Sequence, residues 1–179
     1  MTRKYELLKE DYILYKGAKL YRIKALKSFG DIKKGDLGGY IQSESNLSHK
    51  GNCWVYKGGQ ISENCRVYGN AKISGNVIVN DWACVSGNAE IFGNIKIFGN
   101  AKISKNPIVI TGFVYPVVIT DNLILIGCER FTFDKLVKVD NKYVTNMSSM
   151  AGKQWAINKK FILGLAKNHQ QSLKKGKSE

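Results

Sequence analysis

The sequence predicts a mainly β protein built on a solenoid, with a β-hairpin before it and a helical segment after it. Three observations predict this class: a six-residue period in the middle of the chain, glycines at fixed positions of that period, and scarce proline. The 179 residues include 18 glycines and 2 prolines. From Trp54 the successive hexads read WVYKGG, QISENC, RVYGNA, KISGNV, IVNDWA, CVSGNA, EIFGNI, KIFGNA and KISKNP.

Each hexad has the pattern of a short strand followed by a corner. Val or Ile stands second in every hexad, and a small or aliphatic residue usually stands sixth. Side chains alternate along a strand, so Ala71 and Ile73 should point inward while Lys72 and Ser74 point outward. The following Gly75-Asn76 pair tolerates positive φ and can turn the chain. Three hexads would close a triangular coil of 18 residues, and successive coils would stack through strand hydrogen bonds.

The repeat extends in weaker form beyond the clear hexads. Residues 39–41, 45–47 and 51–53 keep the corner and the small inward residue and would add about one coil. Residues 108–113 form a looser hexad, and residues 118–123 resume the phase. We therefore expect the solenoid to span residues 37–128.

The two ends of the chain differ from the repeat. Residues 1–36 should form a β-hairpin that turns near Lys16-Gly17 and caps the first coil. Residues 129–168 should be helical, with Ser148 or Ser149 as the N-cap of a helix that runs to about Asn168. Residues 169–179 are polar and predict a flexible basic tail.

The repeat also carries a resemblance to known proteins. Hexads of this kind are typical of the hexapeptide-repeat family, which implies a left-handed parallel β-helix. A closer resemblance, to uncharacterised phage and prophage β-helix proteins, rests on residues 20–41 (LYRIKALKSFGDIKKGDLGGYI), 46–48 (NLS), 51–56 (GNCWVY) and 126–129 (IGCE). That resemblance implies a fold and a phage context, and it implies no activity.

Residues for enzymatic chemistry are scarce. Many hexapeptide-repeat proteins are acyltransferases with a catalytic His, but none of the hexads from Trp54 contains His, and the chain has only His49 and His169. The metal-dependent carbonic anhydrases of this fold need three His. The four cysteines lack metal-ligand spacing, so the sequence favours buried thiols over metal ligands; they are Cys53, Cys65, Cys84 and Cys128. We expect no catalytic residues, no metal and no cofactor.

Two surfaces are candidates for contacts. The outward side of one solenoid face is too apolar to remain solvated and should meet the C-terminal helix or another subunit; its residues, with the helix residues expected to meet them, are Trp54, Tyr56, Phe92, Ile108, Ile110, Trp155 and Ile162. The alternative for the apolar helix stripe, a partner-binding face, stays open. A basic ridge should follow the helix and tail; its residues are Lys153, Lys160, Lys167, Lys174, Lys175 and Lys177.

Charge supplies the remaining functional signal. The formal net charge is +14, and residues 135–179 contain ten Lys against two acidic residues. This balance suits an anionic partner, although a solvated lysine surface would explain it as well. We expect a non-enzymatic phage or prophage protein that inhibits a host factor, such as a defence protein or ribonucleoprotein complex, with nucleic acid as another partner.

Other expectations follow from the composition. No apolar run is long enough for a membrane span, and the charged start is unlike a signal peptide, so the chain is expected in the cytoplasm without a membrane partner. A homodimer or homotrimer is also expected. The alternatives are an acyltransferase with a degenerate site and a self-polymerising β-helix scaffold.

Overall fold

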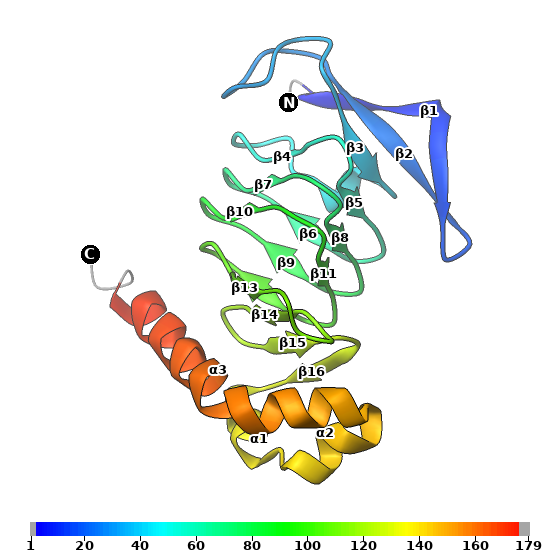
Figure 1. The fold of residues 1–179 in the computed structure, drawn as a ribbon. Coiled ribbons are helices and arrows are strands. Elements are labelled where there is room, and N and C mark those ends of the chain that lie inside the picture. Colours follow the sequence, from blue (N-terminus) through cyan, green and yellow to red (C-terminus); the bar gives the residue numbers. More distant parts are fainter. Residues whose placement is uncertain (1–2, 176–179) are drawn as a thin grey trace. The chain divides into compact units, whose positions relative to one another are not determined.

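The computed structural model describes residues 3–175, which divide into two compact units between Asn106 and Pro107. The first unit contains the N-terminal hairpin and the solenoid, and the second contains a small sheet and helices. Each unit has a buried core of its own. In Figure 1 the colours follow the chain from the hairpin β1–β2 through the stacked coils to the long helix α3.

The first unit begins with an antiparallel hairpin of β1 (Tyr5–Tyr15) and β2 (Ala18–Ala25). The chain reverses at Lys16 and Gly17, whose φ angles are 49° and 81°. Positive φ at both central residues gives a turn whose twist matches that of the paired strands. The hairpin therefore turns at the position that the sequence predicts.

Short parallel strands form the solenoid, and their bounds match the hexads. Trp54 pairs with Lys72 and Lys72 pairs with Glu90, so each residue meets the one that lies 18 positions further along the chain. The mainly β solenoid of stacked parallel strands is confirmed. Its strands are β3 (Leu37–Ile41), β4 (Trp54–Val55), β5 (Gln60–Ile61), β6 (Arg66–Val67), β7 (Lys72–Ile73), β8 (Ile78–Val79), β9 (Cys84–Val85), β10 (Glu90–Ile91), β11 (Lys96–Ile97) and β12 (Lys102–Ile103).

The strands stack in columns. One column follows β3, β5, β8 and β11, another follows β4, β7 and β10, and another follows β6, β9 and β12. Strand β3 also pairs antiparallel with β2, so the hairpin continues one sheet of the solenoid. The inward residues, such as Ile61, Ile73 and Ile97, are fully buried.

Glycine is required at several corners because neighbouring coils approach closely there. Gly69 has a φ of 73°, and a Cβ on it would lie 3.0 Å from the backbone nitrogen of Gly87 in the next coil. The Gly38-Gly39 pair is crowded in a different way, because a Cβ on Gly39 would lie 2.3 Å from the carbonyl oxygen of Gly59. That pair belongs to strand β3, where it lets the backbone enter the first coil.

Aromatic rings of the N-terminal segment cover the start of the solenoid core. Trp54 is buried, and its ring centroid lies 5.4 Å from that of Phe29 and 6.3 Å from that of Tyr5. Lys4 is buried beside them and donates hydrogen bonds to the carbonyl oxygens of Cys53 and Gly51. The first coil is thus capped by the chain that precedes it.

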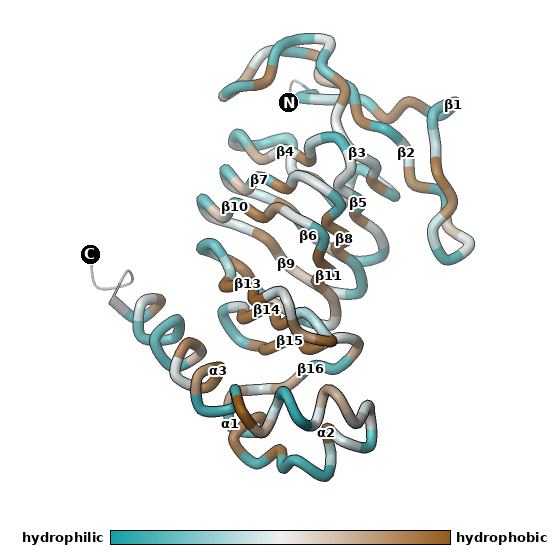
Figure 2. Tube along the Cα trace, in the orientation of Figure 1, coloured by the Kyte–Doolittle hydropathy of each residue, from teal (hydrophilic) through white to brown (hydrophobic). Residues whose placement is uncertain are grey.

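The second unit departs from the solenoid pattern. Its sheet is an antiparallel meander in the order β13–β14–β15–β16, with bounds Ile108–Ile110, Val117–Ile119, Ile124–Ile126 and Glu129–Phe131. The expectation that solenoid coils continue to residue 128 therefore does not hold, because the parallel stacking ends at β12. Figure 2 shows β13, β14 and β15 as largely hydrophobic, whereas β16 is more polar.

Helices complete the second unit: α1 (Phe133–Lys138), α2 (Asn141–Met147) and α3 (Ser149–Lys175). The side chains of Thr132 and Asp140 accept hydrogen bonds at the starts of α1 and α2. Helix α3 passes Asn168 and continues to Lys175, so residues 169–175 are helical and not the flexible tail that their polarity suggests. No helix among residues 3–175 has an apolar stretch that could span a membrane.

Candidate functional site

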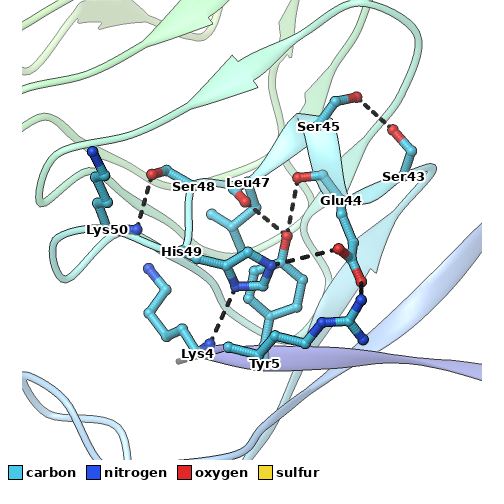
Figure 3. A network of polar contacts seen from close by, with 10 residues as sticks. Lys4, Tyr5, Ser43, Glu44, Ser45, Leu47, Ser48, His49 and Lys50 are labelled. Carbon is cyan, nitrogen blue, oxygen red and sulfur yellow. Dashed lines mark hydrogen bonds and ion pairs between the residues drawn. The ribbon is translucent and has the colours of Figure 1, made fainter. Parts of the chain in front are cut away.

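His49 lies in a polar cluster where the N-terminal strand meets the first coil (Figure 3). Its ring stacks on Tyr5 at a centroid distance of 4.3 Å. Its Nδ1 accepts a hydrogen bond of 3.2 Å from the backbone N–H of Lys4, and its buried Nε2 lies 3.7 Å from Oε2 of Glu44. Glu44 belongs to the short helix η1 (Glu44–Asn46), and the Tyr5 hydroxyl donates to the Leu47 carbonyl oxygen at 2.7 Å.

Among the described residues, only Nδ1 of His49 has a hydrogen-bond partner, whereas Nε2 makes a longer contact with the Glu44 carboxylate. A backbone N–H can only donate, so Nδ1 is the nitrogen with the lone pair, and the neutral ring carries its proton on Nε2, toward Glu44. A general base needs a lone pair that can reach the substrate. In this arrangement the Nδ1 lone pair is already used by Lys4, so His49 serves to fix the N-terminal strand on the solenoid.

A surface hollow of about 380 Å³ lies beside this cluster. Its lining carries two cationic residues, Arg3 and Lys9, and two acidic ones, Glu6 and Glu44. Arg3 lies 3.5 Å from Glu44, so one of the cations is paired within the lining. The balance of charges gives this hollow little preference for an anionic ligand.

A second hollow, of about 190 Å³, lies on the solenoid and has a different character. It combines Trp82, whose relative exposure is 69 %, with the exposed Arg66, and it has no acidic residue in its lining. We call it the Trp82 hollow; its lining residues are Ser45, Asn64, Cys65, Arg66, Trp82, Ala83 and Cys84. An exposed indole beside a guanidinium can stack on a planar ring while the cation binds a phosphate.

Two carboxylates lie one residue away from that lining, at Glu63 and Asp81. Each accepts a backbone hydrogen bond, because Glu63 Oε2 binds the N–H of Asp81 at 2.9 Å and Asp81 Oδ2 binds the N–H of Gly99 at 2.7 Å. Both residues have positive φ, 59° and 62°, so these side chains stabilise corners where Gly is absent. The other oxygens have different partners: Glu63 Oε1 lies 3.9 Å from Lys16 Nζ, and Asp81 Oδ1 accepts a hydrogen bond of 3.2 Å from the Asn80 side chain.

His169 lies in a different setting from the flexible tail that its sequence position suggests. It is buried on α3, and its Nε2 is 3.8 Å from Oδ1 of Asp121 within the second unit. Its burial suits a role in holding the helix on the sheet more than a role in contact with a substrate. His49 and His169 belong to different units.

The residues expected to form one docking face are distributed over both units. Trp54 is buried under Phe29 and Tyr5, whereas Phe92 is exposed. Ile108 and Ile110 lie in β13, where Ile108 pairs with Ile119, and so they do not continue the column of Trp54 through strand pairing. Trp155 and Ile162 are buried in the core of the second unit, with Val117, Ile119, Ile124 and Leu136 among their companions. Tyr56 is half-buried, and its hydroxyl donates to Asp31 at 2.6 Å.

The basic ridge stays a prediction as a partner-binding surface, although several of its lysines are exposed. Lys153, Lys160, Lys167 and Lys174 are exposed on α3. Lys175 ends that helix, and Lys177 lies outside the described residues. The cysteines are free, with Cys53 and Cys65 buried, and no group of three or more metal-ligating residues occurs within residues 3–175.

Comparison with known proteins finds a partial similarity to a protein that is named as an acetyltransferase. No family model matches the chain. A protein of Escherichia coli (strain K12), named as the uncharacterized acetyltransferase YdcK, is 38 % identical to it over 61 residues, which cover 30 % of this chain. The match spans 19 % of that relative, so this chain corresponds to about a fifth of its length.

This similarity corrects the expectation of a non-enzymatic protein, because the relative is named as an enzyme. It fits the hexad repeat and the solenoid, and it favours the acyltransferase alternative over the inhibitor of a host factor. The phage context, the host partner and the homo-oligomer stay predictions.

The sequence analysis did not single out the Trp82 hollow. The signal that could have found it is the hexad IVNDWA, in which Asp-Trp stands where other hexads have Gly-Asn at the corner.

Proposed function

We propose that the protein is an acyltransferase that uses an acyl-coenzyme A donor. The observation that carries the proposal is the 61-residue similarity to a protein named as an acetyltransferase, in a chain that forms a solenoid of hexads. The net charge of +14 also suits a donor with several phosphate groups.

The Trp82 hollow is the place that fits such a donor best. The indole of Trp82 offers a stacking surface for the adenine ring, and Arg66 offers a guanidinium for phosphate oxygens. Base–aromatic stacking contributes about 1–3 kcal/mol. The hollow beside Glu44 suits this ligand less because its acidic residues match its cations.

The reaction balances without a redox partner. An acceptor amine attacks the thioester carbonyl carbon, the new C–N bond replaces the C–S bond, and the amine proton passes to the departing thiolate. The described contacts assign no base to this step, since His49 already uses its Nδ1 lone pair. We therefore place the donor at Trp82 and make no assignment for the proton acceptor.

Calorimetric titration with acetyl-coenzyme A tests the donor site. The parent protein should bind, and Trp82→Ala and Arg66→Ala should each weaken binding about tenfold, because each removes about 1.4 kcal/mol of contact. Phe92→Ala, which removes an equally exposed aromatic ring elsewhere on the solenoid, is the matched control and should bind as the parent does. Binding that is absent, or that is equally strong in all variants, would contradict this site.

A further inference from the structure

Helix α3 carries an apolar stripe on the side that faces solvent. Met150, Ile157 and Phe161 have relative exposures of 63 %, 80 % and 57 %. Their spacings of seven and four residues place them on one line along the helix. Large apolar residues that are singly exposed are ordinary, but three in line on one helix form a contiguous surface.

The stripe has a cationic border. Lys153, Lys160 and Lys167 are exposed and follow one another at intervals of seven residues, next to the stripe on the helix surface. Helix α3 contains six Lys and no Asp or Glu in its 27 residues. Its solvent-facing side therefore joins exposed apolar side chains to positive charge that no acid on the same helix offsets.

This surface is not needed for the fold of the second unit. The opposite side of α3 supplies the buried residues Trp155, Ile162 and Ala166, which pack on the β13–β16 sheet. Lys159, by contrast with the border lysines, is engaged within the unit, since its Nζ donates to the Val139 carbonyl oxygen at 2.8 Å. The stripe and its lysine border can thus serve an external contact while the helix stays docked.

We propose that the stripe and its lysine border bind the surface of a bilayer that contains anionic phospholipid. The three apolar side chains would enter the headgroup region, and the lysines would lie at the level of the phosphates. Anchorage of this kind goes beyond the proposed acyl transfer and does not depend on it. The expectation of no membrane partner rests on the lack of a spanning apolar run, and binding to a bilayer surface needs no such run.

Charge and shape favour this occupant over the others. A second copy of α3 would bring a second set of six Lys without acids, so the two helices would repel one another. Nucleic acid would use the lysines, but Met150 and Ile157 offer no aromatic ring on which a base could stack. A bilayer is deformable, so it can accept a convex helix surface without a matching groove.

Sedimentation with lipid vesicles tests the proposal. The full chain should sediment with vesicles of phosphatidylcholine mixed with phosphatidylglycerol and should stay in solution with phosphatidylcholine alone. The Ile157→Ser and Phe161→Ser double variant should bind at least about tenfold more weakly, and Gln at Lys153, Lys160 and Lys167 should weaken binding about a hundredfold. Higher salt should weaken binding as well.

Matched controls separate this surface from general charge and apolarity. Leu14→Ser changes an exposed aliphatic residue on the N-terminal hairpin, and Gln at Lys50, Lys57 and Lys96 removes the same charge from exposed positions in the first unit. Both control proteins should bind vesicles as the parent does. Because all the altered side chains are exposed, their thermal melts should match that of the parent.

A spectroscopic variant reports insertion without any loss of binding. Phe161→Trp in a Trp82→Phe background places an indole in the stripe, and its emission should shift to the blue only with the anionic vesicles. Trp54 and Trp155 are buried and supply a constant background. An unshifted spectrum, vesicle binding that survives the Ser variants, or tight binding to bare nucleic acid with none to vesicles would overturn the proposal.

Discussion

The buried ammonium group of Lys4 donates a hydrogen bond of 2.8 Å to the carbonyl oxygen of Cys53, and it also lies 3.3 Å from the Cys53 sulfur. Lys4 is only 1 % exposed, and burial lowers the pKa of its ammonium group below the usual value. The ring of Phe29 lies 4.9 Å from the same nitrogen. Lysine is rarely buried without partners, and here the partners are backbone carbonyls at the open end of the first coil.

Lys4→Ala should therefore lower the free energy of unfolding by about 2–4 kcal/mol, because it leaves buried carbonyl groups without donors and opens a cavity. Chemical denaturation monitored by circular dichroism measures the change. Lys9→Ala removes an exposed lysine of β1, whose Nζ lies 3.9 Å from the Tyr21 ring centroid, and should change stability by less than about 1 kcal/mol. Equal stabilities of the two variants would show that Lys4 does not hold the N-terminal cap in place.

The buried thiol of Cys65 should make stability depend on alkaline pH. Burial raises the pKa of this thiol from 9.0 to about 12. In the unfolded chain the thiol would ionise near pH 9.0, so its contribution to stability is fully present below that pH and is lost as the pH rises toward 12. The slope for this one group is about 1.4 kcal/mol per pH unit.

Cys65→Ala should flatten the decline of stability above pH 9.0 by that slope. Cys128→Ala, which removes an exposed thiol, is the control and should follow the parent curve. Unfolding free energies measured across the alkaline range make the comparison. Parallel curves for parent and Cys65→Ala would show that the Cys65 thiol ionises as readily in the folded protein as in the unfolded chain.

Gly39 allows the close approach of β3 to the first coil. A Cβ at this position would lie 2.3 Å from the Gly59 carbonyl oxygen and 2.7 Å from that of Tyr56. Gly39→Ala should therefore destabilise the protein by about 3 kcal/mol. Gly164→Ala is the matched substitution, because a Cβ there meets no atom within 4 Å and Ala favours the helix by about 1 kcal/mol. Thermal melts should move in opposite directions; a shared direction would contradict the crowding at Gly39.

His49 should act in structure and not in catalysis. His49→Phe keeps a ring to stack on Tyr5 but removes the acceptor for the Lys4 N–H. We expect it to lower stability by about 1–3 kcal/mol, since the backbone N–H loses its partner. Its acyl-transfer rate per folded molecule should equal that of the parent. A rate that falls about a hundredfold or more with an unchanged melting temperature would restore His49 as a base.

The solenoid could be predicted because each hexad contains both the inward residue and the corner residues of one strand. The inward Ile73 and the Gly75-Asn76 corner lie within a few residues of one another, so the local sequence is enough to predict the coil. Residues 108–131 look similar because alternation is the same in parallel and antiparallel strands. The change to a meander depends on long-range pairing, as between Ile108 and Ile119.

The candidate sites were harder to predict because they join distant positions. His49 contacts Lys4 and Tyr5, which lie more than forty residues earlier in the chain, and no local sequence motif predicts these contacts. The polar sequence around His169 predicts a flexible tail, but the segment is helical and the helix places His169 on its buried side. Trp82 becomes conspicuous only when the structure leaves it exposed beside Arg66 of the preceding coil.

Release of free coenzyme A thiol from acetyl-coenzyme A in the presence of amine acceptors is the most direct test of the proposed acyl transfer. The parent protein should release thiol above the uncatalysed rate and form the acetylated amine in equal amount, seen by mass spectrometry. Phe92→Ala should retain this activity, and Trp82→Ala should lose at least about tenfold in kcat/KM. Thiol release at the uncatalysed rate with every amine, from protein that is folded and titrates with no heat of acetyl-coenzyme A binding, would contradict this proposal.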